Sequence, residues 1–141
     1  NFFINTLSQD EEWIRYFFEK YPNLTHLLET YTNRIINYFT TFSHNFEKEK
    51  SQLDVFFGLR KSNIKKIEMF SGDIHFGRCV MAVNFECGKK LYYKPRKAGN
   101  EQFLVDFISF LSSLGLKIKL KIPEFKNYQD HSWHIHKEFG S

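Results

Sequence analysis

The chain has 141 residues, a length typical of one domain, with or without an appended piece. Hydrophobic residues make up 42% and aromatic residues 18% of it, which excludes an intrinsically disordered chain. A formal net charge of +4 is too small to predict nucleic-acid binding by itself. No apolar run approaches the ~20 residues that a membrane-spanning helix needs. Two cysteines without a secretory signal predict reduced thiols in a cytoplasmic protein.

The first sixty residues are predicted to be helical. The sequence Ser8–Glu11 fits a capping box, which begins a helix by satisfying free backbone N–H groups. Aromatic residues then recur every four positions from Trp13 to Tyr21, a spacing that predicts a buried aromatic face. Pro22 suits the first turn of a second helix, whose apolar stripe continues to Phe46. A third, short helix is expected over Gln52–Leu59.

The second half of the chain has the patterns of strands around one helix. We expect, in order, a strand at Ile64–Phe70, a hairpin of Cys79–Phe85 with Leu91–Tyr93, a helix at Glu101–Leu114 capped by Asn100, a strand at Leu116–Ile122, and a hairpin of Glu124–Tyr128 with Ser132–Glu138. These elements predict an α+β fold with a mostly antiparallel sheet and one helix between its halves. The expected division is a helical segment at residues 1–60 and a sheet-containing region at residues 61–141.

The first of these hairpins carries a cluster of polar residues. Asp73, His75 and Arg78 lie at its open start, and Lys94 and Arg96 lie where its second strand returns. In an antiparallel pair these two ends are neighbours, so an acid, an imidazole and several cations should converge. Such a cluster suits a phosphate-rich ligand. Taken singly, Lys94 also fits an ordinary surface lysine, and Asp73 with His75 also fits an ordinary turn.

Three histidines near the end of the chain are candidate zinc ligands: His131, His134 and His136. No cysteine or acid at the usual spacing completes such a site, so no metal ligands are predicted. The lysines at 117, 119 and 121 form one face of the expected strand and leave a nucleic-acid binder as a weaker alternative.

Several of these residues together resemble a known family. The chain has Gly72-Asp73-x-His75-x-Gly77-Arg78, then a hydrophobic strand and turn, then Tyr92-Tyr93-Lys94-Pro95-Arg96. This ordered pair of motifs resembles the N-terminal, DUF4135-like dehydratase domain of class II lanthipeptide synthetases (the LanM type). The resemblance covers about Tyr21 to Phe139.

The resemblance implies a lipid-kinase-like fold, of which residues 61–141 would form a kinase-like N-lobe. It implies an enzyme that uses ATP and Mg²⁺ to phosphorylate Ser and Thr of a ribosomal precursor peptide. The same enzyme then eliminates the phosphate to give dehydroalanine and dehydrobutyrine. The kinase-like C-lobe and a zinc-dependent cyclase domain would lie elsewhere in a longer protein, so this stretch alone is expected to be inactive.

Carried over by position, Lys94 matches the nucleotide-side lysine, and Asp73 with His75 match the phosphate-facing pair. Arg78 and Arg96 are motif arginines, expected to help bind the nucleotide. Because kinases pair the strand lysine with a helix glutamate, Glu101 and Asp106 are candidate partners. The alternative is an inactive kinase-like scaffold fragment or a module that docks the leader of the precursor peptide.

Overall fold

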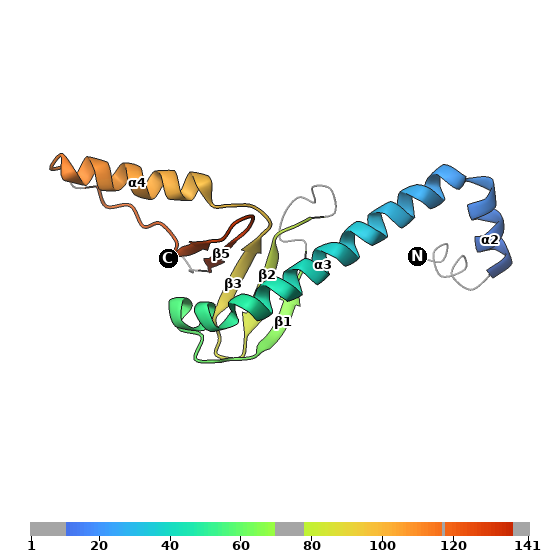
Figure 1. Cartoon of the computed structure of the whole chain (residues 1–141), viewed down its shortest axis with the longest axis horizontal. Helices are drawn as coiled ribbons and strands as arrows, with labels where there is room; N and C mark the ends of the chain where they lie inside the picture. Colours follow the sequence, from blue (N-terminus) through green and yellow to red (C-terminus); the bar gives the residue numbers. More distant parts are fainter. Residues whose placement is uncertain (1–10, 70–77, 117, 137–141) are drawn as a thin grey trace. The chain divides into compact units, whose positions relative to one another are not determined.

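The computed structural model describes residues 11–69, 78–116 and 118–136 (Figure 1). Within these ranges it has three helices and five strands: α2 (Glu11–Lys20), α3 (Pro22–Phe57), β1 (Ile64–Glu68), β2 (Met81–Phe85), β3 (Lys90–Lys94), α4 (Gly99–Ser113), β4 (Phe125–Asn127) and β5 (Ser132–Ile135). The predicted α+β class is confirmed. None of the described helices combines the length and the apolar composition that crossing a membrane requires.

The chain divides into two compact units, and the boundary falls inside α3, after Ser43. In the first unit, the ring of Phe17 lies 5.6 Å from that of Trp13 and 5.0 Å from that of Tyr21. The aromatic spacing therefore does bring these rings together. No residue of α2 is buried, however, and Trp13 remains 44% exposed, so the predicted burial of this face is wrong. The expected capping box at residues 8–11 lies almost wholly outside the described residues.

Helix α3 begins at Pro22, as predicted, but it continues without a break to Phe57. The separate helix expected at Gln52–Leu59 is therefore wrong, because those residues form the last turns of α3. Gly58 follows with a φ of 62°, the left-handed conformation that commonly ends helices. The side chain of Lys89 donates a hydrogen bond to the last helical carbonyl, which fastens this end to the sheet.

The five strands form one antiparallel sheet in the order β1-β2-β3-β5-β4. The predicted hairpin is confirmed as β2–β3, closed by hydrogen bonds from Phe85 N to Lys89 O (2.8 Å) and from Gly88 N to Phe85 O (3.0 Å). Gly88 has a φ of 84°, which favours glycine in such a turn. The second hairpin is also confirmed, with strands shorter than expected.

One face of the sheet packs against the C-terminal part of α3, which crosses it in Figure 1. The ring of Phe46 lies 6.0 Å from Trp133 and 6.2 Å from Phe85. The core includes nine large side chains that are at most 2% exposed: Leu53, Phe57, Leu59, Met81, Val83, Phe85, Leu91, Tyr93 and Trp133. Because side chains alternate along a strand, the neighbours of these core residues point to the opposite face. That second face carries Lys94.

Helix α4 occupies the predicted stretch but starts differently. It begins at Gly99, and its N-cap is Ala98 rather than Asn100. The Ala98 N–H donates to the side-chain oxygen of Asn127, at 2.7 Å, so an amide on β4 holds the start of α4. The predicted buried side is also wrong, because no residue of α4 is buried and Phe103 is 69% exposed.

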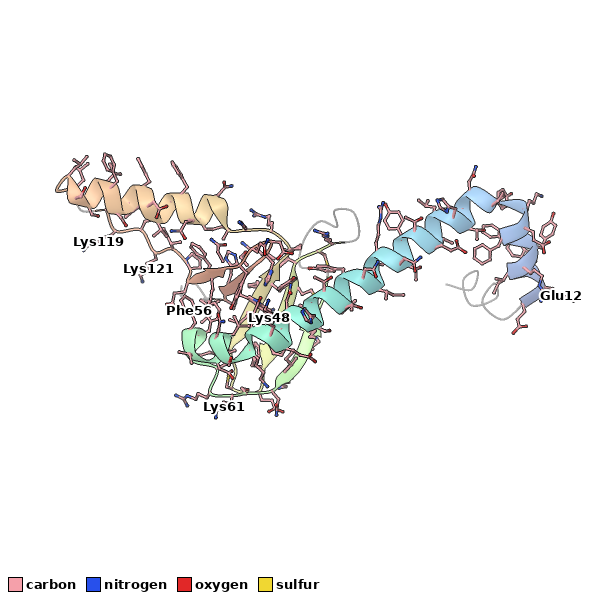
Figure 2. All side chains as sticks on the ribbon, in the orientation of Figure 1. Glu12, Lys48, Phe56, Lys61, Lys119 and Lys121 are labelled. Carbon is pink, nitrogen blue, oxygen red and sulfur yellow. The ribbon has the colours of Figure 1, made fainter. Side chains whose placement is uncertain are left out.

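The segment after α4 does not form the strand predicted at Leu116–Ile122. Its described residues have no strand assignment, and Leu116, Ile118 and Leu120 are between 42% and 54% exposed. Figure 2 labels Lys119 and Lys121 on this stretch, which returns from α4 toward β4. Alternation alone predicted a strand, but a strand also needs a neighbour to pair with, and the described sheet gives it none.

Candidate functional site

The candidate site is built around Lys94, the last residue of β3. Its neighbour Tyr93 is 1% exposed on the core face, and the Tyr93 hydroxyl accepts a hydrogen bond from Asn45 Nδ2 at 3.1 Å. This anchor on α3 fixes the orientation of the strand end. Since successive side chains point to opposite faces, Lys94 projects from the other side of the sheet.

The ammonium of Lys94 forms an ion pair with Glu101. Lys94 Nζ lies 3.0 Å from Glu101 Oε1, and the two side chains are 25% and 24% exposed. Glu101 lies in the first turn of α4, where a carboxylate interacts favourably with the helix dipole. Of the two acids weighed as partners, Glu101 makes the contact, and Asp106 accepts a hydrogen bond from Gln102 instead.

The protonation of Glu101 reflects two opposing effects. Burial raises the pKa of this carboxyl group, but the hydrogen bond from Lys94 and the attraction of its charge lower the pKa below its usual value overall. Glu101 Oε2 is buried and has no hydrogen-bond partner in the described part of the chain. The Glu101 carboxyl group is therefore ionised at neutral pH, and one of its oxygens is engaged by Lys94.

A second polar group lies next to this pair, on β5. Ser132 is the register partner of Lys94, and His134 is the partner of Tyr92. The Ser132 hydroxyl donates to the carbonyl oxygen of Arg96 at 2.8 Å and lies 3.0 Å from His134 Nε2. The backbone after β3 is thereby tied to β5.

The charge state of His134 is set by its surroundings. Burial, the main cause, and the positive charges of Lys94 and Arg96 together lower the pKa of His134 from 6.5 to about 4, although the charge of Glu101 opposes them. The imidazole is therefore neutral at physiological pH. The charges of Lys94 and Arg96 thus both act on the ring of His134.

Arg78, the other motif arginine, acts on a different group. Its charge contributes to lowering the pKa of Asp130 and opposes the rise in the pKa of Tyr93. Asp130 Oδ1 lies 2.7 Å from His131 Nδ1. Arg78 is exposed, so its guanidinium remains accessible from solvent.

His131 is the centre of a buried polar cluster that ties α3 to the second hairpin. Its Nε2 lies 3.0 Å from Glu49 Oε2, and the indole N–H of Trp133 donates to the same oxygen at 2.9 Å. Glu49 and His131 are 4% and 3% exposed. Glu49 thus accepts two hydrogen bonds in the core, which compensates the cost of burying its charge. The cluster supports β3 from the core side and does not face Lys94.

The remaining predicted residues, Asp73 and His75, lie outside the described residues. Of the described residues on either side of them, Met69 follows β1 and Arg78 precedes β2. Met81 of β2 pairs with Tyr93 of β3.

The sequence alone indicates no role for Ser132 or His134 in this site, and it suggests His134 only as a candidate zinc ligand. No group of three metal-ligating side chains is found among the residues that the structure describes. The missing signal was register: only the pairing of β3 with β5 puts Ser132 beside Lys94. The sequence offered one hint, because polar residues occupy alternate positions in the strand that contains Trp133.

Comparison with known families gives one match. A family described as a domain of unknown function (DUF4135) matches residues 21–138, which covers most of the chain. The matched region contains Lys94, Glu101, Ser132 and His134. Among curated proteins, no match was found.

Proposed function

Because the chain belongs to the DUF4135 family of domains of unknown function, we propose that it is the nucleotide-binding part of an ATP-dependent peptide dehydratase. In this proposal the enzyme is a lanthipeptide synthetase, which phosphorylates Ser and Thr of a precursor peptide and then eliminates phosphate. The single observation that carries the proposal is the ion pair between Lys94 at the end of β3 and Glu101 on the following helix.

The order of elements supports a kinase-like reading of this pair. Protein kinases hold ATP with a lysine on their third strand, and a glutamate of the helix that follows pairs with this lysine. Here Lys94 ends the third strand, and Glu101 lies in the first turn of the next helix, α4. Two further antiparallel strands follow that helix. The pair and its topological position support the proposal.

The charges near Lys94 fit a polyphosphate. An ammonium can donate three hydrogen bonds, so Lys94 can contact phosphate oxygens while it stays bonded to Glu101. Arg96 adds a second cation on the same segment. Such groups aid phosphoryl transfer mainly by positioning and by neutralising charge. Glu101, the carboxylate next to Lys94, bonds it through Oε1, while its Oε2 makes no hydrogen bond among the described residues.

The chemistry would proceed in two steps. The hydroxyl oxygen of a peptide Ser or Thr attacks the γ-phosphorus of ATP, and ADP leaves. A base then removes the proton on the α-carbon, a carbon–carbon double bond forms, and the phosphate departs with the C–O electrons. His75 and Asp73 remain the sequence-based candidates for proton transfer.

The test is mass spectrometry of a precursor peptide incubated with ATP, Mg²⁺ and the protein as encoded by its gene. We expect the peptide to lose one water per modified residue. Lys94→Met should reduce this conversion by about a hundredfold or more, because it removes a charge that neutralises the phosphates. Glu101→Gln should reduce it less, because the lysine remains.

Lys90→Met is the matched control. Lys90 lies on the same strand and the same face, and it also forms an ion pair with a carboxylate, Glu68 Oε2, at 3.1 Å. The Lys90→Met variant should dehydrate the peptide at the wild-type rate. If Lys94→Met and Lys90→Met behave alike and both retain dehydration, the proposed role of Lys94 is wrong.

One observation favours a second function, a binding module. The apolar side of α4 is exposed, with Phe103 at 69% and Phe110 at 57%, and large exposed apolar surfaces mark interaction sites. A scaffold or leader-docking role needs no lysine. It would be supported if Lys94→Met kept full function while substitutions on α4 abolished it.

A further inference from the structure

Ser132 makes two hydrogen bonds that together determine which atoms carry the protons. Its hydroxyl has one hydrogen, and the carbonyl oxygen of Arg96, at 2.8 Å, can only accept. The Ser132 hydroxyl therefore donates to Arg96. It follows that His134 Nε2, at 3.0 Å, must be the donor in the second bond, so the ring carries its proton on Nε2.

The imidazole of His134 is enclosed by groups from several elements. The ring of Phe125 on β4 stacks against it, with centroids 5.6 Å apart, and the whole residue is 5% exposed. The charged groups that act on it are Lys94, Arg96 and Glu101. Among the residues that the structure describes, the other titratable register partner of His134 is Tyr92, which bonds His136 through its hydroxyl.

We propose that Ser132 and His134 are a positioning pair, which holds the chain after β3 so that Lys94 and Arg96 present their charges to the same phosphate group. This inference rests on the proposed function, because it concerns the same site. It assigns a role to two residues that no motif singled out. Neither residue touches the ligand; both act through the Arg96 carbonyl and the strand end.

The neutral state of His134 is part of this arrangement. A protonated ring would place a third positive charge beside Lys94 and Arg96, and it would compete with Lys94 for Glu101. A neutral ring that donates from Nε2 leaves Glu101 to Lys94 and leaves Ser132 free to donate to Arg96. A permanently charged side chain at position 134 would weaken both the Lys94–Glu101 ion pair and the hydrogen bond from Ser132 to Arg96.

The first test needs no nucleotide. Long-range ¹H–¹⁵N NMR of the histidine rings distinguishes the charged ring and the two neutral tautomers. At pH 7 we expect His134 in the wild-type chain to be neutral and protonated at Nε2. A charged ring, or a ring protonated at Nδ1, would overturn the inference regardless of what the protein binds.

The second test compares His134→Gln with His134→Leu in the ATP-dependent reaction. Glutamine can donate to Ser132 and cannot become charged, whereas leucine fills the space against Phe125 and cannot donate. We expect the Gln variant to keep the wild-type KM for ATP. We expect the Leu variant and Ser132→Ala to raise it by roughly fivefold, the effect of one lost hydrogen bond.

His136→Leu is the control, because His136 is exposed and its ring bonds the hydroxyl of Tyr92, whereas its backbone N–H bond to Lys90 does not depend on the side chain. Equal KM values for the Gln and Leu variants would mean that the hydrogen bond is irrelevant, and the inference would be abandoned. If the Leu variant does not fold, Ser132→Ala supplies the same comparison. Wild-type protein that makes no use of ATP would refute the proposed function, while the NMR test would still decide the hydrogen-bond arrangement.

Discussion

The side chains of Lys94 and Glu101 are each about a quarter exposed, an intermediate between surface and buried ion pairs. Fully exposed pairs contribute little to stability, and fully buried pairs are costly to desolvate. A pair in between can keep its geometry and still be reached by a ligand. At the scale of single residues, this accessibility distinguishes Lys94 from the buried cluster around Glu49, which no ligand can reach.

His134 predicts how stability depends on pH. Its pKa falls from 6.5 to about 4 in the folded chain, so below about pH 6.5 the unfolded state binds a proton that the folded state does not. Stability should therefore decrease as the pH falls from 6.5 to 4, by about 3 kcal/mol at most. Urea unfolding at a series of pH values measures this change. His134→Gln should abolish its contribution, and an unchanged slope in that variant would contradict the prediction.

At the scale of elements, α3 is attached to the sheet by two kinds of contact on one side of the helix. Asn45 and Glu49 make polar contacts with Tyr93, His131 and Trp133. Leu53, one turn further, is fully buried. Polar bonds fix the helix in one orientation, and apolar burial supplies most of the free energy.

Removing the carboxylate of Glu49 should be strongly destabilising. Glu49→Ala leaves the indole N–H of Trp133 and the ring of His131 without their shared acceptor. We expect a loss of about 3 kcal/mol or more in the free energy of unfolding. The neighbouring Glu47 is exposed, so Glu47→Ala should change stability by less than about 0.5 kcal/mol. Equal midpoints for the two variants in urea would disprove the role of the cluster.

Two apolar residues near the end of α3 allow a second comparison. Leu53 is 0% exposed and Val55 is 86% exposed. Leu53→Ala should cost about 2–5 kcal/mol, because it removes buried methyl groups and leaves a cavity. Val55→Ala should have almost no effect, or a slight stabilising one, because alanine has the higher helix propensity. Thermal unfolding followed by circular dichroism measures both.

Sequence patterns predicted the elements well where a local rule sufficed. Pro22 marked the start of α3, and the turn around Gly88 located the β2–β3 hairpin. The patterns failed where the outcome depends on what an element packs against. Alternation at 116–122 predicted a strand without a pairing partner, and the apolar spacing of α4 predicted burial although no described neighbour covers it.

The candidate site, like the fold, could be predicted only where a local rule sufficed. Lys94 and its possible partner Glu101 followed from motif and order. The hydrogen bond between Asn127 and Ala98 could not be predicted, because it joins residues 29 positions apart through the sheet. Ser132 and His134 depended on the register between β3 and β5, which nothing local in the sequence determines.

At the scale of the whole molecule, the main feature is that several large apolar side chains are exposed to solvent. Phe103 and Phe107 stack on each other on α4, with centroids 6.0 Å apart, and are 69% and 45% exposed. Such a surface promotes association of chains in water. A net charge of +4 opposes this weakly, and salt screens that repulsion.

Replacing both residues with glutamate should therefore reduce concentration-dependent association. Sedimentation velocity at several protein concentrations is the measurement, and the shift toward the monomer should be largest at high salt. The variant should keep the wild-type stability to within about 1 kcal/mol, because the two rings bury little surface. Unchanged association would show that α4 is not the surface responsible.

The partners of Glu49 in the core, His131 and Trp133, follow it by more than eighty positions in the chain. A ribosome making this protein therefore releases the Glu49 carboxyl group long before the groups that hydrogen-bond to it exist. Until the β4–β5 hairpin emerges, α3 cannot make these contacts with the sheet. Contacts between residues this distant in sequence are also slow to form. Nascent chains stalled before Trp133 should consequently remain sensitive to protease along α3, and chains released just beyond it should acquire protection in one step.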